Sequence, residues 1–198
     1  MRPRHAPAGF TLLEVLITLI ILAIGMLGLA NLQSKIHVAE VESYQRAHAV
    51  LLLQDMIDRI NSNRGDAATY ANVDELGTDT DEDCDDATLD AVPAANKLAR
   101  RDRCQWSDAL LGASEQKGGN NVGTLINARG CITEIQAADS TAGVCQPGIY
   151  RVVVVWQGLH KTVPPGDDCG AGNYGADDAL RRAITMDISI GVPRCASP

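Results

Sequence analysis

The stretch GFTLLEVLITLIILAIGMLG, residues 9–28, decides the fold because it is apolar enough to enter a lipid bilayer and yet contains the acid Glu14. The apolar run continues to residue 32, and as a helix residues 10–32 measure about 34 Å at 1.5 Å per residue. That length crosses a hydrocarbon core of about 30 Å. A full charge inside such a segment costs about 3 kcal/mol even on lenient insertion scales. The sequence therefore predicts a transmembrane helix in which Glu14 needs a compensating interaction.

The totals allow one membrane anchor and one head of ordinary size. The chain has 198 residues, which is too short for two independent cores beside the anchor. The formal net charge of -8 makes the chain acidic, so it repels phosphate backbones, and no nucleic-acid partner is expected.

The leader, residues 1–9, differs from an ordinary secretory signal. It is basic through Arg2 and Arg4, and its apolar stretch follows it, whereas a secretory signal carries the apolar core before the cleavage site. Basic residues favour the cytoplasmic side of a membrane. We therefore expect a single-pass membrane protein with its N-terminus on the cytoplasmic side and everything after residue 32 on the far side.

All six cysteines follow the apolar run. This asymmetry indicates a head in an oxidising compartment, where disulfides form. A zinc site is disfavoured, because the sequence has no Cys-x-x-Cys pair and His160 is the one histidine after the long helix. Several connectivities are possible, and pairing between sequence neighbours is the simplest. It predicts the disulfides Cys84–Cys104, Cys131–Cys145 and Cys169–Cys195.

The helical pattern does not stop at the membrane surface. In residues 33–62 apolar positions recur at three- and four-residue steps, with charged residues on the other faces, and the stop signals NSNRGD begin at Asn61. An amphipathic stripe of this kind has to pack against another element.

Strand patterns are confined to the last third of the chain. The candidates are residues 124–135, broken by Gly130, residues 150–158 and residues 183–192. The last of them alternates most cleanly, with one apolar face made by Ile184, Met186, Ile188 and Ile190. In the middle candidate, one apolar stripe is typical of a sheet core; it comprises Tyr150, Val152, Val154 and Trp156.

Two connections lack these patterns. Residues 64–103 are polar and irregular, with a short helix expected at residues 94–101. Residues 160–182 are rich in Pro and Gly, which predicts a long loop that a disulfide Cys169–Cys195 would close onto the last strand.

The fold class predicted from these elements is α+β: a long N-terminal helix, membrane-spanning in its first half, packs on a C-terminal antiparallel sheet. The expected organisation is a leader (1–9), a transmembrane assembly helix (10–32), its amphipathic continuation (33–62) and a disulfide-containing head outside the cytoplasm (63–198).

The acidic run resembles a calcium loop only in part. Five aspartates fall at the positions of oxygen ligands: Asp79, Asp81, Asp83, Asp85 and Asp90. Cys84, however, stands where the loop needs Gly, and no Glu closes it, so we expect a solvated loop anchored by a disulfide and no metal or cofactor.

Motifs of catalysis are missing from the sequence. It contains no Gly-x-Ser-x-Gly, His-Glu-x-x-His or phosphate-binding glycine loop, and His160 has no nucleophile near it in sequence. We therefore expect no enzymatic activity.

The segment GFTLLEVLITLIILAIGMLGLANLQ resembles the N-terminus of type IV pilins and pseudopilins, and residues 25–33 with RGCI, YRVVVVWQG and CG followed by RR are similar to the minor pilin PilV family. The resemblance implies cleavage after Gly9 by a prepilin peptidase, N-methylation of Phe10 and a type IV pilin-like fold. It also implies partners: other minor pilins, the major pilin, the inner-membrane assembly machinery and membrane lipid. The location that it implies is the bacterial inner membrane, as a single-pass protein with a periplasmic head, before assembly, and the pilus at the cell surface after assembly.

Simple electrostatics also explains why an acid can stand at position 14 of the apolar segment. Cleavage before Phe10 creates an α-amine about one helical turn from Glu14, and in a filament of parallel helices the amine of one subunit can neutralise the acid of its neighbour. The alternative is local: Thr11 and Glu14 have the spacing of a capping box, in which the acid bonds backbone N–H groups at the helix start. Both roles can hold at different stages.

The function expected from these features is that of a minor type IV pilin that helps to initiate or prime pilus assembly and so supports motility and adhesion. One alternative is a minor pseudopilin of a type II secretion system. Another is a membrane-tethered adhesin or ligand-binding head, with the acidic run or the Cys169–Cys195 loop as its contact surface.

Overall fold

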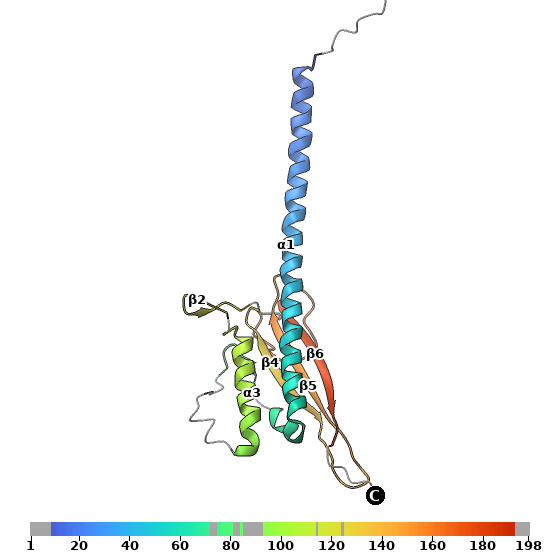
Figure 1. Cartoon of the computed structure of the whole chain (residues 1–198). Coiled ribbons are helices and arrows are strands. Elements are labelled where there is room, and N and C mark those ends of the chain that lie inside the picture. The colour runs from blue at the N-terminus through green and yellow to red at the C-terminus, as the bar shows by residue number, and fades with distance from the viewer. Residues whose placement is uncertain are drawn as a thin grey trace, which may run out of the picture. The chain divides into compact units, whose positions relative to one another are not determined.

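The computed structural model describes residues 9–71, 75–80, 84, 93–113, 115–123 and 125–192. The chain divides into two compact units, Met1–Val41 and Glu42–Pro198. The element order is α1 (Leu12–Ser62), η1 (Arg64–Tyr70), β1 (Leu76–Gly77), α3 (Ala94–Leu110), β2 (Gln116–Lys117), β3 (Asn120–Asn121), β4 (Arg129–Gln136), β5 (Gly148–Gln157) and β6 (Arg181–Ile190) (Figure 1).

The predicted long helix is confirmed as α1. It begins at Leu12, after Thr11, and ends at Ser62, within the stop signals. Asn61 and Ser62 close the helix by donating side-chain hydrogen bonds to the carbonyl oxygens of Ile57 (3.0 Å) and Asp58 (2.8 Å). Side-chain bonds of this kind, from a residue to the carbonyl oxygen four positions before it, compete with the backbone pattern of a helix and are common where a helix ends.

In the second unit, α1 packs on one face of an antiparallel sheet, as predicted. The strand order is β1-β4-β5-β6, so β5 has a partner on each side. The predicted core stripe of β5 is buried in one cluster with residues of α1 and α3. The α1 residues in this core are Ala49, Leu52, Leu53, Met56, Ile57 and Ile60. The α+β fold class is therefore confirmed.

A second, smaller core lies on the other face of β5. Val153 and Val155 are buried there against Cys169 and Tyr174, which belong to the loop of residues 158–180. This segment is a loop, as predicted, and its Cys169 and Tyr174 cover this face of β5. Because β5 is covered on both faces, its four consecutive valines are all buried, which explains the unbroken apolar run.

Helix α3 is longer than the predicted residues 94–101, because it continues to Leu110. Its last two turns bury Trp106 and Leu110 in the main core, and the Trp106 indole N–H donates to the Leu52 carbonyl oxygen of α1 at 2.8 Å. Gly112 then adopts a φ of +68°, a left-handed conformation that ends helices. Burial of these side chains in the core stabilises the extra turns, and local composition alone does not predict that burial.

Gly130 does not break its strand, contrary to the prediction. It lies inside β4 and pairs with Val154 of β5. A Cβ atom at this position would lie 2.2 Å from the Trp106 ring. The glycine therefore provides the space in which α3 approaches the sheet.

The last strand is less buried than its alternation predicted. β6 is an edge strand, and although Ile190 is buried and Ile184 and Ile188 are packed against the core, Met186 is 43% exposed. The central strand β5, and not β6, provides most of the sheet core.

The disulfides correct the predicted pairing. Cys84–Cys104 is present as expected, but Cys131 is bonded to Cys169, so Cys131–Cys145 and Cys169–Cys195 are wrong. Cys145 is also disulfide-bonded, and Cys195 lies outside the described residues. The reason is the loop of residues 158–180, which folds back over β5 and brings Cys169 next to Cys131 of β4.

Candidate processing and assembly site

The predicted cleavage site directly precedes α1. Gly9 and Phe10 are both exposed, and the Phe10 side chain is 85% accessible. A Cβ atom built on Gly9 meets no atom within 4 Å, and the φ of this glycine does not lie in the left-handed region. The packing of the described residues therefore does not require glycine at this position.

Thr11 caps the first turn of α1. The Glu14 N–H donates to Thr11 Oγ1 at 3.3 Å and to the Thr11 carbonyl oxygen at 3.1 Å. This is the first half of the predicted capping box, in which a threonine oxygen satisfies a backbone donor of the helix start. The second half of a capping box would be a hydrogen bond from the Thr11 backbone N–H to the Glu14 carboxylate.

The Glu14 carboxylate makes no hydrogen bond or ion pair with any residue that the structure describes. The cap is therefore built by Thr11 without consuming the acid. Glu14 itself lies one helical turn from Phe10, on the exposed surface of α1.

The side chains around Glu14 form an apolar and exposed surface. No part of the most apolar stretch of α1 is buried, and the helix is long and apolar enough to cross a membrane. The exposed apolar side chains of the first unit include Leu12, Leu16, Leu19, Ile20, Ile24 and Leu27. A surface of this kind requires lipid or other apolar helices around it.

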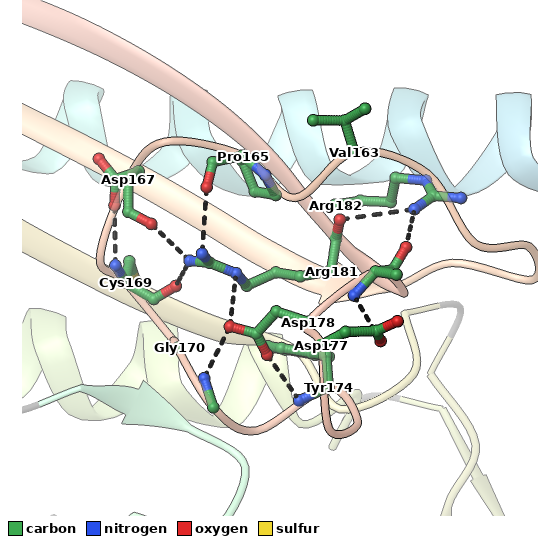
Figure 2. A network of polar contacts seen from close by, with 12 residues as sticks. Val163, Pro165, Asp167, Cys169, Gly170, Tyr174, Asp177, Asp178, Arg181 and Arg182 are labelled. Atoms are coloured by element: carbon green, nitrogen blue, oxygen red, sulfur yellow. Dashed lines mark hydrogen bonds and ion pairs between the residues drawn. The ribbon is translucent and has the colours of Figure 1, made fainter.

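In the head, two charged residues that the sequence did not predict fix the loop of residues 158–180; they are Arg181 and Glu42. Arg181 at the start of β6 is only 5% exposed, and its guanidinium donates to the carbonyl oxygens of Asp167, Cys169 (2.7 Å) and Pro165 (3.1 Å) (Figure 2). Asp178, an ion-pair partner of Arg181 at 3.5 Å, also accepts from backbone N–H groups of the loop. The loop is thus held around one buried cation.

Glu42 of α1 holds the beginning of the same loop. Its carboxylate accepts from the Leu159 N–H at 3.1 Å and contacts Arg182 at 3.3 Å and His160 at 3.5 Å. Burial acts to raise the pKa of Glu42, but the hydrogen bond from Leu159 and the charge of Arg182 outweigh it and lower the pKa below its ordinary value. The ionised acid is therefore the form that fastens the loop.

The sequence gives only a weak signal for the roles of Arg181 and Glu42. A pair of arginines before a strand, or a glutamate on an amphipathic helix, forms the same sequence pattern whether the side chain faces solvent or binds a loop. His160, which had no role in the sequence, lies at this contact.

The acidic run is only partly described. Asp79 pairs with the buried Arg129 at 2.9 Å, whereas Asp81, Asp83, Asp85 and Asp90 lie outside the described residues. Among the residues that the structure does describe, no group of three His, Cys, Asp or Glu side chains is arranged to hold a metal ion.

Comparison with known proteins identifies the N-terminal segment. The prokaryotic N-terminal methylation motif matches residues 4–30, the segment that contains Gly9, Phe10 and Glu14. No curated protein and no solved structure gives a significant match to the chain. The motif, followed by a long apolar helix and an α+β head, supports a membrane-anchored prepilin of the type IV pilin-like class.

Proposed function

We propose that this chain is a minor type IV pilin that takes part in initiating pilus assembly and so supports motility and adhesion. A prepilin peptidase cuts between Gly9 and Phe10, the new terminus is methylated, and the mature chain enters a filament. The observation that carries the proposal is the Glu14 carboxylate, which has no partner among the described residues and lies on an exposed apolar helix inside the methylation motif.

Glu14 acts in this proposal through electrostatics in an apolar environment. Alone, the acid is costly in lipid, and so is a terminal ammonium group. When the acid of one subunit meets the amine of another, both charges are satisfied, and any wrong axial offset between the helices leaves them unpaired. The pair therefore sets the position of a subunit along the filament.

The disulfides support a periplasmic head. Two disulfides and a disulfide-bonded Cys145 lie in the described part of the second unit, and disulfides persist in oxidising compartments. The proposed partners are the prepilin peptidase, other minor pilins, the major pilin and the inner-membrane assembly machinery. The proposed work is done by packing and charge pairing, without a catalytic group.

The test compares Glu14→Ala with Glu40→Ala. Glu40 lies on the same helix, is exposed and pairs only with His37 in the described residues, so it is a matched control. We expect both variants to insert and to lose the leader. The amount of the Glu14→Ala chain in sheared surface filaments should fall at least about tenfold, because the terminal amine that loses its acid costs more than about 1.4 kcal/mol when unpaired. The amount of the Glu40→Ala chain should stay at the wild-type level.

The readout is quantitative mass spectrometry of membranes and of sheared pili from the same cells. A Glu14→Ala chain that enters filaments as well as the wild type would favour a plain membrane tether and reject the proposal. Absence of the wild-type chain from pili, with secretion defects on its deletion, would favour a secretion pseudopilin instead.

A further inference from the structure

The two described disulfides differ in their relation to the order of the cysteines. Cys84 and Cys104 are neighbouring cysteines, 20 residues apart. Cys131 is bonded to Cys169, 38 residues away, although Cys145 lies between them. The second disulfide therefore passes over a cysteine that can compete for Cys131.

Before the sheet forms, Cys145 is the favoured partner of Cys131. The two are 14 residues apart, against 38 for Cys131 and Cys169. The probability of loop closure falls with about the 3/2 power of loop length, so the shorter loop closes about four to five times more readily in an unfolded chain. Cys145 also precedes Cys169 when a head that follows an N-terminal anchor crosses the membrane.

The folded sheet is incompatible with this early pairing. Cys131 lies in β4, whereas Cys145 lies next to Gln146, which pairs with Asp139 beyond the end of β4. The strand from Cys131 to Gln136 alone spans about 16 Å at about 3.3 Å per residue. A disulfide needs Cα atoms within about 7 Å, so a Cys131–Cys145 bond has to break before β4 and β5 can pair.

The native bond, by contrast, needs the sheet. Cys169 belongs to the loop of residues 158–180, which follows β5 and lies over Val153 and Val155. It comes next to Cys131 only when β5 already lies beside β4. The competing bond therefore forms before the hairpin of β4 and β5, and the native bond forms after it.

We propose that the head is a substrate of a thiol–disulfide isomerase that converts a Cys131–Cys145 bond into Cys131–Cys169. The isomerase thiolate attacks the Cys131 sulfur, the bond to Cys145 breaks, and Cys145 leaves as a thiolate. The Cys169 thiolate then attacks the Cys131 sulfur of the mixed disulfide, and the isomerase thiolate leaves. One disulfide is exchanged for another, so no oxidant is consumed. The proposal rests on the proposed function for the periplasmic location of the head.

The first experiment follows the full chain in bacteria with and without their periplasmic disulfide isomerase. Free thiols are trapped by acid and alkylation, and disulfide-linked peptides are quantified by mass spectrometry. Without the isomerase, Cys131–Cys169 should fall about five- to sixfold and Cys131–Cys145 should accumulate. Cys84–Cys104 joins neighbouring cysteines and should not change, so it is an internal control.

A double variant, Cys145→Ala with Cys195→Ala, removes both cysteines outside the two described bonds. Without its competitor, Cys131–Cys169 should form equally well in both strains. Full formation of Cys131–Cys169 in the wild-type chain of isomerase-deficient cells, with no trapped Cys131–Cys145, overturns the proposal.

A second experiment separates this proposal from the proposed function. The purified full chain, reduced and unfolded in detergent, is reoxidised with oxidised glutathione, with and without an added isomerase. Without isomerase, Cys131–Cys145 should at first exceed Cys131–Cys169 about four- to fivefold. Added isomerase should speed the appearance of Cys131–Cys169 and leave Cys84–Cys104 unchanged; equal rates overturn the exchange. A head that stays fully reduced in cells while this acceleration is seen rejects the periplasmic location and leaves the exchange supported.

Discussion

Gly130 shows how a single missing Cβ atom sets the distance between a helix and a sheet. The position faces the ring of Trp106 and the end of the Leu110 side chain, both of which are buried. The aromatic ring is rigid, and its indole N–H is held by the Leu52 carbonyl oxygen at 2.8 Å. A methyl group can be accommodated only if α3 moves.

We therefore expect Gly130→Ala to lower the free energy of unfolding of the head by about 2–3 kcal/mol, through overpacking. Gly166→Ala is the control, because a Cβ atom there meets nothing within 4 Å, and it should change the free energy by less than about 0.5 kcal/mol. Denaturant unfolding followed by tryptophan fluorescence measures both. Equal stabilities of the two variants would contradict the packing that we describe.

The prediction that Gly130 breaks its strand was wrong for the same reason as the other wrong predictions. A glycine in a strand pattern indicates either a break or a close approach of another element, and only the position of Trp106 decides between them. Likewise, the partner of Cys131 depends on where a distant loop lies. The capping role of Thr11 could be predicted, because it involves neighbours three residues apart.

Among the elements, those with a strong local period were predictable. The apolar run and stop signals located α1, and β-branched runs located β5 and β6. The extension of α3 and the depth of burial of β6 were not predictable, because they depend on which neighbour covers each face. The loop of residues 158–180 was recognised as a loop, but its attachment through Arg181 and Glu42 was not.

The attachment at Glu42 gives the loop a defined pH dependence. The pKa of Glu42 is lowered in the folded chain, so its ionised form contributes stability that is fully present above the ordinary carboxyl pKa and is lost as the pH falls through the folded value. We expect Glu42→Gln to be less stable than the wild type at pH 6 to 7, and this difference to shrink as the pH is lowered from about 5 to about 3.

Amide hydrogen exchange of Leu159 and of the following loop measures the effect locally, and urea unfolding measures it globally. Asp58→Asn serves as the control, because Asp58 is an exposed acid on the same helix. A difference between Glu42→Gln and the wild type that persists unchanged at pH 3 would show that ionisation of Glu42 is not what fastens the loop.

At the level of the whole chain, the two units are stabilised by different means. The apolar residues of the first unit are exposed and need lipid or neighbouring helices, whereas the second unit has its own core on both faces of β5. The cysteines belong to the second unit alone. Reduction of disulfides should therefore act on the head and leave membrane anchoring intact.

The size of this effect follows from the loops that the disulfides close. Cys131–Cys169 closes 38 residues and Cys84–Cys104 closes 20, which correspond to about 4 and about 3 kcal/mol of stability in the chain-entropy estimate. We expect reduction to make the head sensitive to protease at temperatures where the oxidised head resists it. Loss of Cys131–Cys169 alone, in a paired alanine variant, should free the loop of residues 158–180 first, because Arg181 then holds it without a covalent bond.

Carbonate extraction of membranes from the same samples should show equal retention of oxidised and reduced chains, since the anchor contains no cysteine. Release of the reduced chain would contradict this division of the molecule.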